Sequence, residues 1–148
     1  MSYLAIDPGA HSGWAFWRSA QELIACGSGD PRLLPGMVAK AVVIERPEIY
    51  GARFMKGDPN LLVTLAIGVG RYVEYYESRG ARVALVLPKA WKGQIPKPIH
   101  HARLEASFSP HERATVAEGL KYVAKSHHHD VLDAVGLGIA AFQKRLWA

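Results

Sequence analysis

The sequence predicts an α/β layer fold, with the α+β class as the neighbouring alternative. Short apolar segments rich in β-branched and aromatic residues dominate the first third of the chain and have the length of strands. A strand–helix–strand order follows, which is typical of two parallel strands joined by a crossover helix, and the C-terminal part is helical. The 148 residues are enough for one domain with its own core. We therefore expect a single domain over 1–148.

Five segments are predicted to be strands. The first ends in the turn signal Pro8-Gly9, and the next two follow so closely that the three together suggest an antiparallel meander. The fourth is β-branched and is stopped by Pro47. Its link to the fifth through a helix implies that these two strands are parallel. In order, the predicted strands are 2–7, 13–18, 21–26, 41–45 and 81–87.

The helices are predicted from their start and stop signals. Asn60 is expected to cap a long helix that continues to about Ser78 and ends at Gly80. The segment 109–112 (SPHE) has a serine cap, a proline at the first helical position and a glutamate three residues after the cap, so it should begin another helix. Further helices are predicted over 98–106 and 129–146.

The charge of the chain points to a polyanionic partner. The formal net charge is +5 and the pI is near 9.5, which fits nucleic acid, with simple solubility as the alternative. The lone Cys26 excludes an internal disulfide and a cysteine-rich zinc module. No apolar run is long enough to span a bilayer and the N-terminus lacks signal-peptide features, so we expect a cytoplasmic protein with no membrane partner.

Four acidic residues lie at strand ends or on one helix face, which are positions typical of catalytic or metal-binding residues. Asp7 and Glu45 each close an apolar strand, whereas Asp130 and Asp133 lie three residues apart and so share one face of the last helix. Because that helix is largely apolar, its acidic face should point into the protein or a cleft. Each acid also has a harmless interpretation: Asp7 as a turn residue, Glu45 as an ion-pair partner of an arginine, and Asp130 as a helix cap.

A cluster of such acids would require cations. Two carboxylates 4 Å apart repel by roughly 4 kcal/mol at an effective dielectric constant of 20. All-oxygen ligation favours Mg²⁺ or Mn²⁺ over Zn²⁺, and two such ions about 4 Å apart support phosphodiester hydrolysis. The residue pattern therefore predicts a metal-dependent nuclease, on the condition that the four residues meet.

The sequence also resembles a known family. The runs LAIDPGAHSGWAF, VVIERP and HDVLDAVGLGIA resemble the three acidic motifs of RuvC-type Holliday junction resolvases, which belong to the RNase H-like nuclease superfamily. The first motif includes a glycine in the second strand, here Gly13. The run NLLVTLAIGVGRYVEYY resembles the family's central helix, which pairs two subunits. The resemblance covers nearly the whole chain, in the same order.

This resemblance implies a five-stranded mixed sheet in the order 3-2-1-4-5, in which Asp7 lies next to Glu45 and the last helix brings Asp130 and Asp133 to them. It also implies a homodimer that makes paired nicks in a four-way DNA junction; the two Mg²⁺ ions per site follow from the carboxylates. Only fourteen residues (27–40) separate the third and fourth strands, so the family's first helix must be shortened or missing. In this the chain looks like the compact versions found in phages and mobile elements.

Two loops carry the candidate DNA-binding residues. In the resembled family a lysine before the last helices lies near the scissile phosphate, and Lys97 is the best match here, followed by Lys92; a solvated loop charge is the alternative. In the loop after Glu45, an aromatic side chain, Tyr50 or Phe54, is expected to stack on bases, with core or dimer packing as the alternative. The other candidates are Arg46, Tyr50, Arg53, Phe54, Lys56 and Lys89.

The histidines are harder to interpret. Three adjacent histidines, 127–129, cannot all face one ion, and no second pair at zinc spacing exists, so a DNA-facing helix entry is favoured over zinc. Of the three, His129 beside Asp130 is the best candidate for supporting the acids. His100 and His101 are expected to lie at the surface or to face DNA.

Three other functions compete with a junction resolvase. An RNase H-type nuclease on RNA–DNA hybrid would use the same carboxylates. A nucleic-acid-binding module without catalysis would have no use for four acids, which weaken DNA binding. A sugar-kinase or actin-like ATPase needs a second lobe that 148 residues do not supply.

Overall fold

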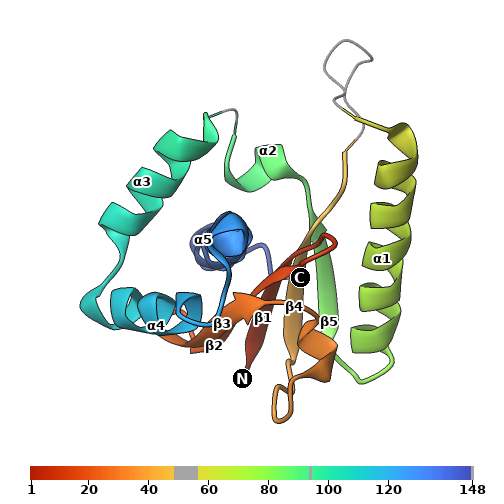
Figure 1. The fold of residues 1–148 in the computed structure, drawn as a ribbon. Coiled ribbons are helices and arrows are strands. Elements are labelled where there is room, and N and C mark those ends of the chain that lie inside the picture. Colours follow the sequence, from red (N-terminus) through yellow and green to blue (C-terminus); the bar gives the residue numbers. More distant parts are fainter. Residues whose placement is uncertain (49–56, 94, 148) are drawn as a thin grey trace.

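The computed structural model describes residues 1–48, 57–93 and 95–147. Its centre is a five-stranded sheet in the order β3-β2-β1-β4-β5, which confirms the predicted order (Figure 1). Strand β1 pairs antiparallel with β2 and parallel with β4, β2 pairs antiparallel with β3, and β4 pairs parallel with β5. The strands are β1 (Tyr3–Asp7), β2 (Gly13–Ser19), β3 (Glu22–Ser28), β4 (Ala41–Glu45) and β5 (Arg82–Val86).

The two central strands are apolar because both of their faces are covered. Successive side chains of a strand point to opposite faces, so Leu4 and Ile6 pack on one side of the sheet while Ala5 packs on the other. Strand β4 divides in the same way, with Val43 on the side of Ala5. All of these side chains are fully buried. Continuous apolar runs are therefore what a parallel pair buried on both faces requires.

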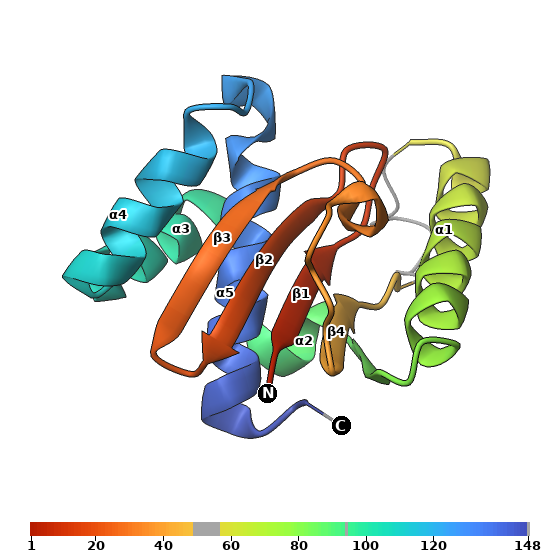
Figure 2. The ribbon, with the colours of Figure 1, turned by 90° about the horizontal axis from the view of Figure 1, so that it is seen from below.

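Helix α1 (Pro59–Glu77) covers one face of the sheet, whereas α5 (His128–Lys144) lies across the other, with α4 beside it against β3 (Figures 1 and 2). The cap of α1 is Asp58, whose side chain accepts a hydrogen bond from the backbone N–H of Asn60, so the expected cap at Asn60 is wrong by two residues. Pro59 explains the shift, since proline suits the first position of a helix and needs no hydrogen-bond acceptor there.

Between β3 and β4 the described chain forms only one 3-10 turn, η1 (Pro31–Leu33). Asp30 caps this turn by accepting from the backbone N–H of Arg32, and the two side chains also form an ion pair at 2.8 Å. A full helix is thus replaced by a single turn, as the length of this segment required.

The C-terminal half contains one helix that the sequence did not predict, the four-residue α2 (Pro88–Trp91) in the lysine-rich loop. Helix α5 ends two residues earlier than expected because Arg145 takes a left-handed conformation (φ 55°) at its C-terminus. In the described segments, no helix is long and apolar enough to cross a membrane. The other helical elements are α3 (Lys97–Ser107), α4 (Pro110–Leu120), which has the predicted Ser109–Glu112 capping box, and η3 (Lys125–His127).

Candidate active site

Asp7 and Glu45 lie side by side at the carboxyl ends of two neighbouring strands. In the parallel register of β1 and β4, Ile6 pairs with Ile44, so the next residue of each strand is one of the two acids. Both faces of these strands are buried and apolar, and the two acids lie at the strands' carboxyl-terminal ends, where the chain continues into loops. The pairing that the resemblance implied is therefore present.

Helix α5 brings the other two acids to the same end of the sheet. In β2, Gly13 lies opposite Asp7, and a Cβ atom on Gly13 would overlap with the backbone carbonyl group of Asp130. The first turn of α5 thus rests directly on the sheet next to Asp7. Asp133, one turn further, is almost completely buried, whereas Asp130 keeps part of its carboxylate exposed.

Asp7 interacts electrostatically with the other three acids of this cluster. The pKa of Asp7 is raised well above its ordinary value, first by burial and then by the negative charges of Glu45, Asp133 and Asp130. Within the described residues, no hydrogen bond or ion pair reaches the Asp7 carboxylate. Asp7 is consequently the acid in this cluster that most lacks a compensating partner.

Glu45 is held by two residues of the segment that follows β5. Trp91 Nε1 donates a hydrogen bond of 2.8 Å to Glu45 Oε2, and Lys92 Nζ lies 3.2 Å from the same oxygen. The Lys92 ammonium group also lies 5.0 Å from the centre of the Trp91 ring. Burial alone would lower the pKa of Lys92, but the charges of Glu45 and Asp133 outweigh it and raise this pKa.

Asp133 is held by two residues of α3. His101 Nε2 lies 2.9 Å from Asp133 Oδ1, and Lys97 Nζ lies 3.2 Å from Oδ2. Burial acts to raise the pKa of Asp133, but the His101 hydrogen bond and the charges of Lys92 and Lys97 outweigh it, so the pKa is lowered and the group is ionised.

Asp130 is flanked by histidines. His129 Nε2 lies 3.1 Å from Oδ1 and His127 Nδ1 lies 3.5 Å from Oδ2, and the ring of His127 packs on that of His11 at 4.2 Å between centroids. His129 thus lies beside Asp130, where a supporting role had been predicted for it. His128 points elsewhere and contacts the backbone carbonyl of Val123.

The chemistry of these donors fits a hard divalent cation. Four carboxylates bring several oxygens to one end of the sheet, and a cation would offset the negative charges of Glu45, Asp130 and Asp133 that oppose the ionisation of Asp7. No group of three acidic, histidine or cysteine side chains in the described part of the chain stands ready in a ligating arrangement. Three of the four acids instead face basic side chains, so a cation has to compete with these partners.

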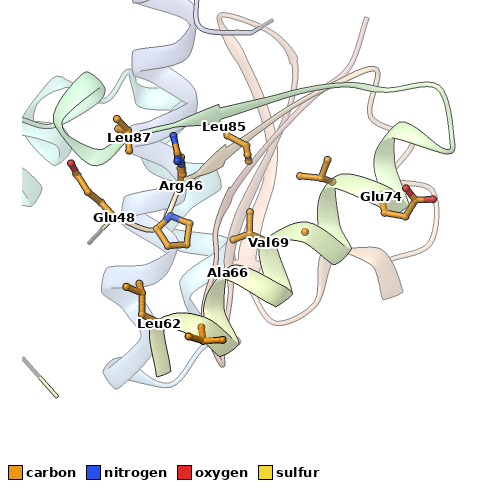
Figure 3. A pocket seen from close by; sticks show the side chains of 12 residues that line it. Arg46, Glu48, Leu62, Ala66, Val69, Glu74, Leu85 and Leu87 are labelled. Carbon is orange, nitrogen blue, oxygen red and sulfur yellow. The ribbon is translucent and has the colours of Figure 1, made fainter. Parts of the chain in front are cut away.

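The candidate DNA-binding residues are spread over a wider area. Lys92 and Lys97 both reach the acids, whereas Lys89 pairs with Glu48 at 3.8 Å. Arg46 is exposed and lines a groove of about 810 Å³ on the α1 side of the sheet (Figure 3). Tyr50, Arg53, Phe54 and Lys56 lie outside the described residues.

Two residues of the site were missed from the sequence. His101 was expected at the surface or facing DNA, but it is mostly buried and bonded to Asp133, because α3 packs against α5. Trp91 was not singled out, although its indole N–H holds Glu45. The four-residue spacing of Lys97 and His101 was an available signal, since it places both on one face of α3.

Structural comparison identifies the fold. Two solved structures of RuvC from Thermus thermophilus, one of them in complex with a Holliday junction substrate, are similar to this chain with TM-scores of 0.56 and 0.54. In both cases the sequence identity is 16%, and the match covers 98% of this chain and 96% of the other. No protein-family model matches the sequence, and no curated protein sequence matches it. The chain therefore has the RuvC fold, as its sequence motifs predicted.

Proposed function

We propose that this protein is a divalent-metal-dependent endonuclease that cuts branched DNA. The observation that carries the proposal is the convergence of Asp7, Glu45, Asp130 and Asp133 from two strand ends and one helix, which leaves a surplus of negative charge around Asp7. Mg²⁺, with Mn²⁺ as a substitute, is the cation that suits these oxygens. When bound, two such ions would activate the attacking water and stabilise the leaving oxygen.

The chain's own residues have separate tasks in this proposal. The four carboxylates hold the ions, and Trp91 fixes the orientation of Glu45 through its indole N–H. We expect Lys97, half exposed at the edge of the cluster, to contact the scissile phosphate, whereas Lys92 lies deeper, against Glu45. Lysine contacts of this kind bind phosphate through charge alone, so binding should weaken as salt rises.

A four-way junction is the substrate that we favour. The similar Thermus thermophilus protein was solved with a Holliday junction substrate, and the formal charge of +5 of this chain suits a polyanion. RNA–DNA hybrid is the main alternative because the same carboxylates would serve it.

The first test is direct. The protein is incubated with Mg²⁺ and labelled four-way junction, flap, plain duplex or RNA–DNA hybrid, and the products are resolved on a denaturing gel. We expect paired nicks in the junction. Cleavage of hybrid without cleavage of the junction would replace the proposal with an RNase H-type activity, and binding without cleavage in both Mg²⁺ and Mn²⁺ would indicate a module without catalysis.

Paired nicks require two sites, and we propose a homodimer formed along α1. This helix exposes Leu61, Val63 and Ile67, each more than half accessible, beside the groove that Leu62, Ala66 and Val69 line with the edge strand (Figure 3). A group of exposed apolar residues on one helix is typical of an interface.

Light scattering should give a mass of twice the 16.2 kDa of one chain, and Ile67→Glu should lower the measured mass toward that of one chain. A wild-type protein of single-chain mass would contradict the paired mechanism.

A further inference from the structure

The two oxygens of Asp133 are held by partners of different kinds. His101, only 14% exposed, contacts Oδ1 at 2.9 Å from a packed helix face, whereas Lys97, 52% exposed, contacts Oδ2 at 3.2 Å at the end of a long flexible side chain. A carboxylate only accepts hydrogen bonds, so His101 Nε2 carries the hydrogen in this contact. One oxygen is therefore fixed by a buried directional bond, and the other by a mobile charge.

Glu45 shows a different arrangement. Trp91 and Lys92 share Glu45 Oε2, and among the described residues no hydrogen bond or ion pair reaches Oε1. A cation can reach Glu45 through Oε1 without displacing either partner. At Asp133 no oxygen is open, so one of its two partners has to leave before a cation can bind.

We infer that His101 is a positioning residue that fixes Asp133 through Oδ1 and presents Oδ2 to the metal, and that Lys97 is a placeholder on Oδ2 that the metal displaces. This inference rests on the proposed function. It assigns opposite effects to two neighbours of one carboxylate: the histidine supports metal binding and the lysine competes with it. The displaced ammonium group remains next to the site, where it can contact a DNA phosphate, so metal and DNA should each strengthen the binding of the other.

The different burial of His101 and Lys97 explains why the metal displaces the lysine and not the histidine. His101 is only 14% exposed on α3, which packs against α5, whereas Lys97 is 52% exposed and can rotate its side chain into solvent. Partners that orient a ligand from outside a metal site typically contribute about 10- to 100-fold to metal affinity. A half-exposed ion pair such as Lys97–Asp133 contributes less free energy than this, so a metal ion can displace Lys97 from Asp133 Oδ2.

The test is Mn²⁺ binding measured by isothermal titration calorimetry without DNA. His101→Leu, which keeps bulk but has no donor, should weaken Mn²⁺ binding about tenfold or more. His101→Gln, whose side-chain amide N–H can replace Nε2, should stay within about threefold of wild type. Lys97→Met, which keeps the apolar stem, should bind Mn²⁺ about threefold to fivefold more tightly. Lys121→Met, which removes an exposed lysine that pairs with Glu118, is the matched control and should leave Mn²⁺ affinity unchanged.

The possible results separate the two proposals. Equal affinity of Lys97→Met and wild type, or His101→Gln as weak as His101→Leu, would overturn this inference while leaving the nuclease proposal intact. Wild-type protein that binds no Mn²⁺ would overturn both. Circular dichroism of each variant checks folding, and because Lys97 is exposed, its variant tests the inference even if His101→Leu does not fold.

Discussion

Replacing Asp7 by asparagine should abolish cleavage and, in the absence of metal, stabilise the protein. Loss of one oxygen ligand should lower the cleavage rate by at least about a hundredfold, because even indirect partners of a metal site contribute about 10- to 100-fold. The stabilisation follows from the raised pKa of Asp7, since burial and three neighbouring carboxylates oppose its ionisation in the folded state. We expect a gain of about 0.5–2 kcal/mol in the free energy of unfolding, which is the common size of a single stabilising substitution.

The pH dependence of this gain is fixed in sign. In the unfolded chain Asp7 titrates near about 3.9, and below that pH both states are protonated, so asparagine brings no advantage there. As the pH rises toward the raised native pKa, the unfolded state loses the proton first, and the wild type is progressively destabilised. Thermal unfolding at several pH values in EDTA should show the gap between variant and wild type widening as the pH rises above about 4 and levelling off above the raised native pKa.

A matched control is Glu118→Gln, which removes the same charge from an exposed pair with Lys121. It should alter neither cleavage nor the response to metal. Added Mg²⁺ should stabilise wild type by about 2.7 kcal/mol at a hundred times its dissociation constant, and the Asp7 variant by much less. An Asp7→Asn protein that unfolds at lower temperature than wild type in EDTA would refute the picture of an uncompensated acid.

The sequence predicted the elements of this fold better than it predicted their contacts. Strand positions and the shared helix face of Asp130 and Asp133 follow from local spacing, which the chain displays directly. The neighbourhood of Asp7 and Glu45 is different, because it depends on strand order, and only the resemblance to a family implied it. The order of strands in a sheet depends on contacts between distant parts of the chain, which residue propensity and periodicity do not encode.

The errors have equally specific causes. The start of α1 was placed at Asn60 because asparagine is a good cap, but Asp58 followed by proline is a stronger signal. Helix α2 has only four residues, too few to show any periodicity. His101 was expected at the surface or facing DNA, whereas its contact with Asp133 joins residues 32 positions apart on two packed helices. Local spacing places His101 on the same face of α3 as Lys97, but it does not show which helix that face packs against.

Gly13→Ala is expected to damage both stability and cleavage. The added methyl group would overlap with the backbone carbonyl of Asp130 and lie 2.9 Å from the backbone nitrogen of Val131. Backbone atoms in the first turn of a buried helix cannot rotate away as a side chain can, so α5 itself would have to move off the sheet. Overpacking of this kind typically costs about 1–3 kcal/mol and occasionally more.

The effect on cleavage should exceed the effect on folding. A shift of α5 moves Asp130 and Asp133 relative to Asp7 and Glu45, and a displacement of about 1 Å in a catalytic group lowers a rate by roughly a hundredfold. Denaturant unfolding and junction cleavage, measured well below the melting temperature, separate the two effects. Gly68→Ala is the control for the unfolding measurement: within the chain a Cβ atom there meets nothing within 4 Å, and alanine favours a helix over glycine by about 1 kcal/mol. If Gly13→Ala cut junctions as fast as wild type, the close contact between β2 and α5 would not be what aligns the four carboxylates.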